Sequence, residues 1–198
     1  APASADLLLT DPPYMTDVSV DIGEFAHSWL PLALSRIKTS GRAYVFIGAY
    51  PLELHAYLAV ALAQPFTLAN VLVWHYTNTL GPRPAMQYKQ NWQAILYLYG
   101  PDAGPLDAPV MTEATTVHTI ATPASSEGKN YDPWQKPIEL ARRFVLHSTR
   151  PGDLLIDPFA GTGTFLLAAA DLGRKAIGCD CDPAKIAIAT QRGCKTDA

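Results

Sequence analysis

The sequence has 198 residues, of which 48% are hydrophobic and 17% charged, and its formal net charge is −3. This length suits one α/β domain, and the small negative charge excludes a chain that attracts polyanions through an overall field. No apolar run reaches the roughly 20 residues of a membrane span, and the three cysteines form no disulfide framework. We therefore expect a cytoplasmic protein without a membrane partner.

Apolar patterns in chain order predict alternating strands and helices. The run 5–10 is continuously apolar, as in a parallel strand covered on both faces. Helical spacing over 21–39, ended by Gly41, predicts the first helix. Further strands are expected at 42–48, 68–76, 92–100, 115–121, 153–157 and 175–180, and further helices at 51–63, 136–148, 164–173 and 183–193. The alternation predicts a doubly wound, mostly parallel, Rossmann-like sheet with helices on both faces.

Residues 100–133 differ in composition from the rest of the chain. They are rich in Gly, Pro, Ala, Ser, Thr and Asp, and contain one strand-like piece. A stretch of this length with so little structure is more often functional than core. We expect an irregular insert in a single domain that spans 1–198.

A glycine turn follows the strand 153–157. Gly161 and Gly163 let the backbone pass close to a ligand, and the next helix offers free N–H groups at its start. Asp180, at the end of the next strand, is placed to accept hydrogen bonds from ribose hydroxyls. The third glycine of the dinucleotide fingerprint is missing, and so is a Walker lysine. A ligand with an adenosine-like group but no pyrophosphate is expected; the alternative is a purely structural turn.

Two cysteines flank that aspartate in the sequence IGCDCD. A C-x-C pair is compatible with a metal site, but no other ligand-rich cluster accompanies Cys179 and Cys181. We expect buried or half-buried structural cysteines and no metal.

The motif Asp11-Pro12-Pro13-Tyr14 ends the first predicted strand. Two consecutive prolines remove two backbone donors and fix φ, so the backbone is stiff directly after a carboxylate and before an aromatic ring. Taken alone, Asp11 is equally compatible with a turn or a helix cap. Tyr14 alone is compatible with a core aromatic.

With TDPPY near its start and DPFAGTG near its end, the chain resembles the amino-methyltransferases that modify DNA bases with S-adenosylmethionine. Residues 134–193 look like the cofactor-binding block of that family almost throughout. The catalytic motif precedes the cofactor motif, as in the permuted β-type class. The resemblance covers 5–15 and 134–193 most clearly, extends to 42–99, and is absent from 100–130.

The resemblance implies a catalytic group formed by Asp11, Pro12, Pro13 and Tyr14. The carboxylate of Asp11 and the carbonyl of Pro12 would accept the two N–H groups of a base amine, and Tyr14 would stack on a base turned out of the duplex. The cofactor residues that it implies are Asp157, Pro158, Phe159, Ala160, Gly161, Thr162, Gly163, Asp180 and Lys136. For Lys136, a surface lysine is the alternative.

The implied reaction is methyl transfer to the exocyclic amine of a DNA base. The sequence DPPY favours adenine N6, with cytosine N4, an RNA amine and a non-catalytic cofactor-binding module as alternatives. The loop 77–91 carries Arg83 and Lys89 for phosphate, and His75 and Tyr76 precede it on a strand. A solvated loop and buried packing are the corresponding alternatives.

Two features depart from the family pattern. Residues 100–133 are short and poor in Lys and Arg for a target-recognition region, and the family has a further strand before its catalytic motif. We expect a domain of a longer bacterial or phage protein that relies on an additional recognition domain, a partner subunit or a second copy for DNA recognition.

Overall fold

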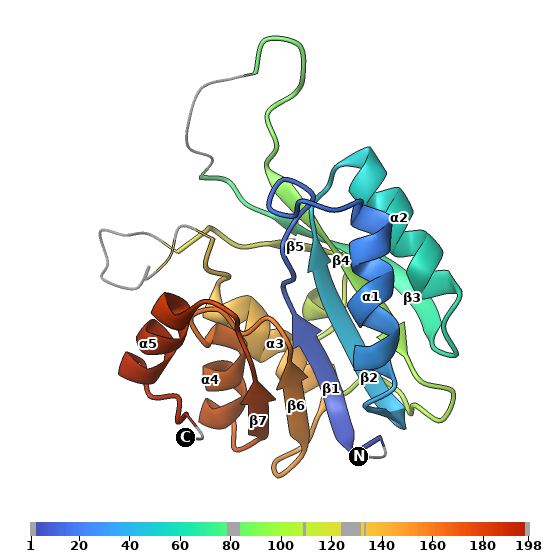
Figure 1. The fold of residues 1–198 in the computed structure, drawn as a ribbon. Coiled ribbons are helices and arrows are strands. Elements are labelled where there is room, and N and C mark those ends of the chain that lie inside the picture. Colours follow the sequence, from blue (N-terminus) through green and yellow to red (C-terminus); the bar gives the residue numbers. More distant parts are fainter. Residues whose placement is uncertain (1–2, 79–83, 109, 124–131, 133, 197–198) are drawn as a thin grey trace.

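The computed structural model describes residues 3–78, 84–108, 110–123, 132 and 134–196 (Figure 1). Within these residues, seven strands form one sheet in the order β5-β3-β4-β2-β1-β6-β7. The strands are β1 (Ala5–Thr10), β2 (Ile37–Ile47), β3 (Thr67–His75), β4 (Trp92–Tyr99), β5 (Val117–Thr119), β6 (Leu154–Asp157) and β7 (Lys175–Gly178). The α/β class predicted from the sequence is confirmed.

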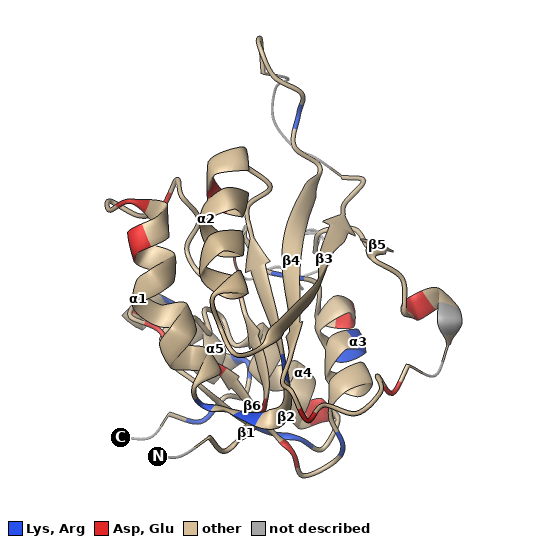
Figure 2. Cartoon of the chain, turned by 90° about the vertical axis from the view of Figure 1, so that its right-hand side faces the viewer, with Lys and Arg blue, Asp and Glu red and all other residues tan. Residues whose placement is uncertain are grey.

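Helices cover both faces of the sheet, which Figure 2 shows edge-on between α1 and α2 on one side and α3 on the other. The apolar faces of the first two pack on one buried cluster, and those of α3 and α4 on a second. The helices are α1 (Ile22–Leu34), α2 (Pro51–Leu62), the short 3-10 helix η1 (Met111–Glu113), α3 (Ile138–Ser148), α4 (Thr164–Asp171) and α5 (Pro183–Gln191). A sheet buried on both faces explains why β1 reads as a continuous apolar run.

Strand β1 lies between β2 and β6 and is parallel to both. The chain thus runs outward from β1 in two directions, and this reversal places a switch point between β1 and β6, where open α/β sheets bind ligands. Strand β4 is antiparallel to β2 and β3, so the sheet is mostly rather than wholly parallel. The strand ends that precede the Asp-Pro-Pro-Tyr motif and the glycine turn therefore lie side by side.

The predicted helix over 21–39 is wrong in its last part. Helix α1 ends at Leu34, and strand β2 already begins at Ile37, whose partner in β1 is Ala5. Gly41 lies inside β2 rather than at a helix end, and a Cβ added there would meet the carbonyl oxygen of Asp6 at 2.7 Å. Pairing with β1 therefore overrides the helical spacing of the apolar residues.

The segment 100–133 contributes little regular structure in its described part. It contains η1 and the three-residue strand β5, which extends the sheet beside β3 at the predicted place. Among the described residues, no helix has both the length and the apolar character needed to cross a membrane.

Candidate functional site

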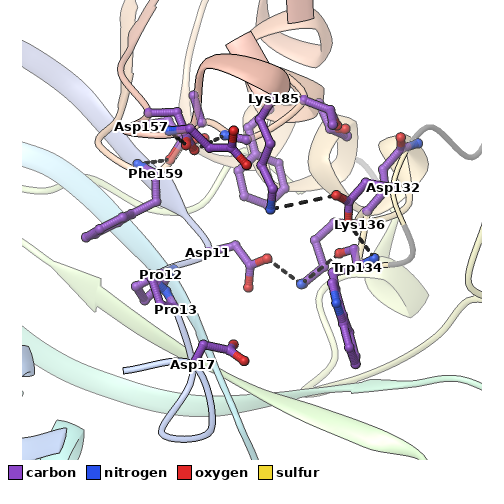
Figure 3. A pocket seen from close by; sticks show the side chains of 18 of the residues that line it. Asp11, Pro12, Pro13, Asp17, Asp132, Trp134, Lys136, Asp157, Phe159 and Lys185 are labelled. Carbon is purple, nitrogen blue, oxygen red and sulfur yellow. Dashed lines mark hydrogen bonds and ion pairs between the residues drawn. The ribbon is translucent and has the colours of Figure 1, made fainter. Parts of the chain in front are cut away.

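A cleft of about 440 Å³ opens where β1 and β6 end. It brings the Asp-Pro-Pro-Tyr motif, the glycine turn and the segment before α3 to one place, as Figure 3 shows. Its lining includes Asp11, Pro12, Pro13, Tyr14, Lys136, Asp157, Phe159, Ala160, Gly161, Thr162 and Asp180. Most of the predicted catalytic and cofactor residues therefore share one cavity, although they come from opposite ends of the sequence.

Asp157 is the buried carboxylate of this cleft, with a side chain 1% exposed. Its Oδ1 accepts hydrogen bonds from the Thr10 hydroxyl at 2.7 Å and from the Phe159 N–H at 3.1 Å. Its Oδ2 is buried without a hydrogen-bond partner. Desolvation raises the pKa of Asp157 to about 7, despite these two hydrogen bonds. A buried oxygen with no partner at a cleft indicates a position prepared for a cationic or hydrogen-bonding ligand.

The glycine turn adopts the left-handed conformation twice. Gly161 has φ +51° and Gly163 has φ +81°, where a side chain is disfavoured. A Cβ added at Gly161 would meet no atom within 4 Å, so open space lies beside this part of the turn. Asp180 holds the turn, because its Oδ2 accepts the Gly161 N–H at 2.7 Å and its Oδ1 accepts the Asp182 N–H at 2.9 Å. The glycine turn and the unpartnered Oδ2 of Asp157 suit an adenosine-like ligand that carries a cation.

Asp182 is the N-cap of α5, since its carboxylate accepts the Ala184 N–H at the start of that helix. The exposure predicted for the cysteines is wrong: both Cys179 and Cys181 are exposed, because they follow β7 beyond the core. In the part of the chain that the structure describes, no group of three or more His, Cys, Asp or Glu side chains is arranged to hold a metal ion.

On the other side of the cleft, Asp11 is held by two donors. Its Oδ1 accepts a hydrogen bond from the Tyr14 hydroxyl at 2.8 Å, and its Oδ2 forms an ion pair with the Lys136 ammonium. The ammonium also donates to the Tyr14 hydroxyl oxygen at 2.8 Å. Burial and the negative charge of Asp11 raise the pKa of Tyr14 well above its ordinary value, so the hydroxyl remains a donor.

Lys136 is buried, with a side chain 4% exposed, and is not the surface lysine that the sequence left open. Its ammonium also donates to the Trp134 carbonyl at 3.3 Å. The rings of Tyr14, Phe46 and Trp74 surround it at 5.4, 5.8 and 5.9 Å from their centroids. Lys136, which the resemblance assigns to the cofactor, thus contacts Asp11 and Tyr14 of the predicted catalytic group.

Glu53, in the first turn of α2, was not identified from the sequence. It is fully buried, and its two oxygens accept the Met15 N–H at 3.1 Å and the Gly48 N–H at 2.7 Å. Burial raises the pKa of this carboxyl. One side chain therefore joins the loop after β1 to the loop after β2 and fixes the backbone that carries the Asp-Pro-Pro-Tyr motif.

We expect Glu53→Ala to lower the free energy of unfolding by about 2–4 kcal/mol, because two backbone N–H groups lose a charged acceptor. Urea denaturation followed by circular dichroism measures this change. Glu24→Ala, at an exposed position of α1, is the control and should shift the value by less than about 0.5 kcal/mol. Equal effects of the two substitutions would contradict a role of Glu53 in holding the loops.

The mouth of the cleft contains further residues that were not predicted. Lys185 of α5 forms an ion pair with Asp132 at 3.7 Å, and Figure 3 shows this pair on the side of the cleft opposite the two prolines. Trp134 is 69% exposed and lines the same opening, as does Asp17. These residues carry no motif of their own, and only the fold brings them to the site.

Of the predicted nucleic-acid residues, His75, Tyr76 and Lys89 lie in the described part of the chain and outside the lining of the cleft. His75, at the end of β3, interacts with the Thr119 hydroxyl of β5 at 3.2 Å. Tyr76 is half-buried and packs on Trp74, with ring centroids 5.1 Å apart. Lys89 is half-buried in the β3–β4 loop, and Arg83 lies outside the described residues.

Comparisons with known proteins agree with this geometry. The sequence profile of the family described as DNA methylase matches residues 5–191. The type II methyltransferase M2.DpnII of Streptococcus pneumoniae is 28% identical over 229 residues, covering 96% of this chain and 83% of the relative. The type II methyltransferase M.HpaI of Haemophilus parainfluenzae is 27% identical over 216 residues, covering 96% and 68%.

Solved structures show the same fold. The complex of M1.HpyAVI with SAM superimposes with a TM-score of 0.76 at 20% identity, covering 96% of this chain and 89% of that one. The cytosine-N4-specific PvuII DNA methyltransferase gives 0.79 at 19% identity, covering 100% and 82%. The profile match spans nearly the whole chain and includes both motifs of the cleft. The protein therefore belongs to the N6/N4 DNA methylase family.

Proposed function

We propose that this protein transfers a methyl group from S-adenosylmethionine to the N6 amine of an adenine turned out of duplex DNA. The observation that carries the proposal is the single cleft in which Asp11 and Pro12 face the glycine turn across the ends of β1 and β6. Family membership supports DNA amino-methylation, and the motif Asp-Pro-Pro-Tyr favours adenine over cytosine. Cytosine N4 is the second candidate, favoured by the fold match to the PvuII enzyme.

In this proposal the cofactor lies on the glycine turn. Asp157 and the backbone of Phe159 to Gly163 bind its methionine part, and Asp180 accepts the ribose hydroxyls. When bound, S-adenosylmethionine supplies an electrophilic methyl group on a sulfonium sulfur. The buried Asp157 oxygen without a partner and the open space beside Gly161 support this assignment.

The chain's own residues prepare the acceptor nitrogen. The lone pair of an exocyclic amine is delocalised into the base, and acceptors for its two N–H groups favour a more nucleophilic nitrogen. Asp11 provides a carboxylate oxygen and Pro12 a backbone carbonyl, which the following proline holds in place. The carboxylate of Asp11 would also accept the proton that the amine releases once its nitrogen carries the methyl group. Tyr14 stacks on the extruded base.

Recognition of the DNA sequence is assigned to surfaces beyond the cleft. The chain has 15 basic against 18 acidic residues, and non-specific DNA affinity requires several phosphate contacts. We propose that an additional recognition domain, a partner subunit or a second copy supplies them, and that the protein acts in a bacterial cytoplasm as the modifying part of a restriction-modification system.

Product analysis tests the proposed function. Unmethylated genomic DNA is incubated with labelled S-adenosylmethionine and the protein, and the hydrolysed nucleosides are separated by mass. We expect N6-methyladenine, and sequencing of the modified DNA then gives the target site. Detection of N4-methylcytosine instead would refute the adenine assignment and support cytosine N4 as the acceptor. Methyl transfer to RNA but not to DNA would refute a DNA substrate.

A further inference from the structure

The ammonium of Lys136 is paired with the carboxylate of Asp11, one of the two acceptors that the proposed function gives to the base amine. It bonds Asp11 and Tyr14 and lies inside a ring of aromatic side chains. We propose that Lys136 occupies the position of the acceptor amine before DNA binds. Its ammonium then holds Asp11 and Tyr14 in place, and it leaves when the target base enters. This inference rests on the proposed function and adds a positioning residue to it.

The Lys136 ammonium and the base amine compete for one acceptor, the carboxylate of Asp11. An ammonium group and an amine N–H are both donors, and an ammonium accepts no hydrogen bond. The two oxygens of Asp11 are already occupied, one by the Tyr14 hydroxyl and the other by Lys136. A base amine that approaches the oxygen paired with Lys136 competes with the ammonium for that oxygen, and the lysine is the donor that does not belong to the rigid motif loop.

The reaction also changes the charge on the acceptor nitrogen. Methyl transfer from a sulfonium carries positive charge from sulfur to the acceptor nitrogen. A second positive charge at hydrogen-bond distance from that nitrogen raises the energy of the transition state, because like charges repel strongly in a water-poor site. The ammonium of Lys136 therefore holds Asp11 in place before the base arrives, but it would slow methyl transfer if it remained there.

Aromatic side chains also surround the ammonium of Lys136. Phe46 is fully buried and Trp74 is 2% exposed, yet both rings face the lysine ammonium. Ring faces attract a cation, and they also suit a flat base. These rings therefore stabilise the ammonium beside Asp11 in the absence of DNA. Asp17 lines the same cleft and offers the displaced ammonium a carboxylate closer to solvent.

Base extrusion measures the competition directly. A duplex carries 2-aminopurine at the target position, or a fluorescent cytosine analogue if the product is methylcytosine, and its fluorescence rises when the base leaves the stack. We expect Lys136→Met, which retains an unbranched apolar side chain but no charge, to increase the equilibrium ratio of extruded to stacked base by about tenfold, the factor of one charged hydrogen bond. Lys136→Gln should act in the same direction, and the KM for DNA should fall with both.

Lys38→Met is the matched control, because Lys38 forms an ion pair with Asp6 at 2.7 Å at the other end of β1. Its extruded fraction should equal that of the wild type. Thermal unfolding of each variant identifies a loss of fold. An extruded fraction at or below the wild-type value in folded Lys136→Met and Lys136→Gln, with methyl transfer by the wild type intact, would overturn this inference alone. A wild type that methylates no DNA would remove the proposed function and this inference together.

Discussion

Asp11→Ala is expected to lower the rate of methyl transfer by about 10³-fold, the scale of a group that acts directly on a reacting nitrogen. The substitution removes the acceptor for the amine N–H and leaves only the Pro12 carbonyl. The affinity for S-adenosylmethionine should stay near normal, because the proposed cofactor contacts come from the glycine turn and from Asp157. Single-turnover rates with labelled cofactor, together with calorimetric cofactor binding, measure the two effects separately.

Asp6→Ala provides a control on the same strand. The Asp6 carboxylate is 18% exposed, against 22% for that of Asp11, and it also forms an ion pair with a lysine. It lies at the opposite end of β1, away from the cleft. Transfer by this variant should remain close to that of the wild type. Comparable rates for Asp11→Ala and the wild type would refute the catalytic role, and loss of cofactor binding would assign Asp11 to the cofactor instead.

The sequence allowed the two halves of the site to be predicted, because each motif lies at the end of an apolar strand. Parallel strands of one sheet have their carboxyl ends at one edge, which is why Asp11 and Asp157 line one cleft. The hydrogen bond from Thr10 to Asp157 links the two strand ends directly. The bounds of β3, β4 and α2 were also predicted closely, because prolines and apolar runs mark these elements in the sequence.

Contacts between distant segments were not predictable. The spacing of Ile37 fits a helix, yet its pairing with Ala5 places it in β2. Glu53 looked like an ordinary first-turn carboxylate of a helix until the fold buried it against the loop after β1. Lys136 was assigned to the cofactor from its motif, and its contact with Asp11, 125 residues away in sequence, is visible only in the structure. Periodicity reports which face is buried but not which partner covers it.

Asp157→Asn should weaken the binding of S-adenosylmethionine by about tenfold to a hundredfold, the range of a charged hydrogen bond. Wild-type affinity should also depend on pH. The pKa of Asp157 is raised to about 7 by burial, so below that pH the protein holds a proton that a cationic ligand must displace. Affinity then falls as pH drops through this value, by at most about tenfold per pH unit. Calorimetric titrations at several pH values should show this slope for the wild type, while the variant should lack it.

The same substitution should have the opposite sign for stability. The folded protein keeps a proton on Asp157 up to pH about 7, whereas an unfolded aspartate releases it near pH 4, at about its ordinary pKa. The stability of the wild type relative to Asp157→Asn therefore falls as pH rises from about 4 to about 7, and the variant gains most above that range. Thermal unfolding at several pH values measures the difference, with Asp153→Asn, just before β6, as the control. A difference that does not change with pH would contradict a raised pKa of Asp157, and unchanged cofactor affinity would remove it from the proposed cofactor site.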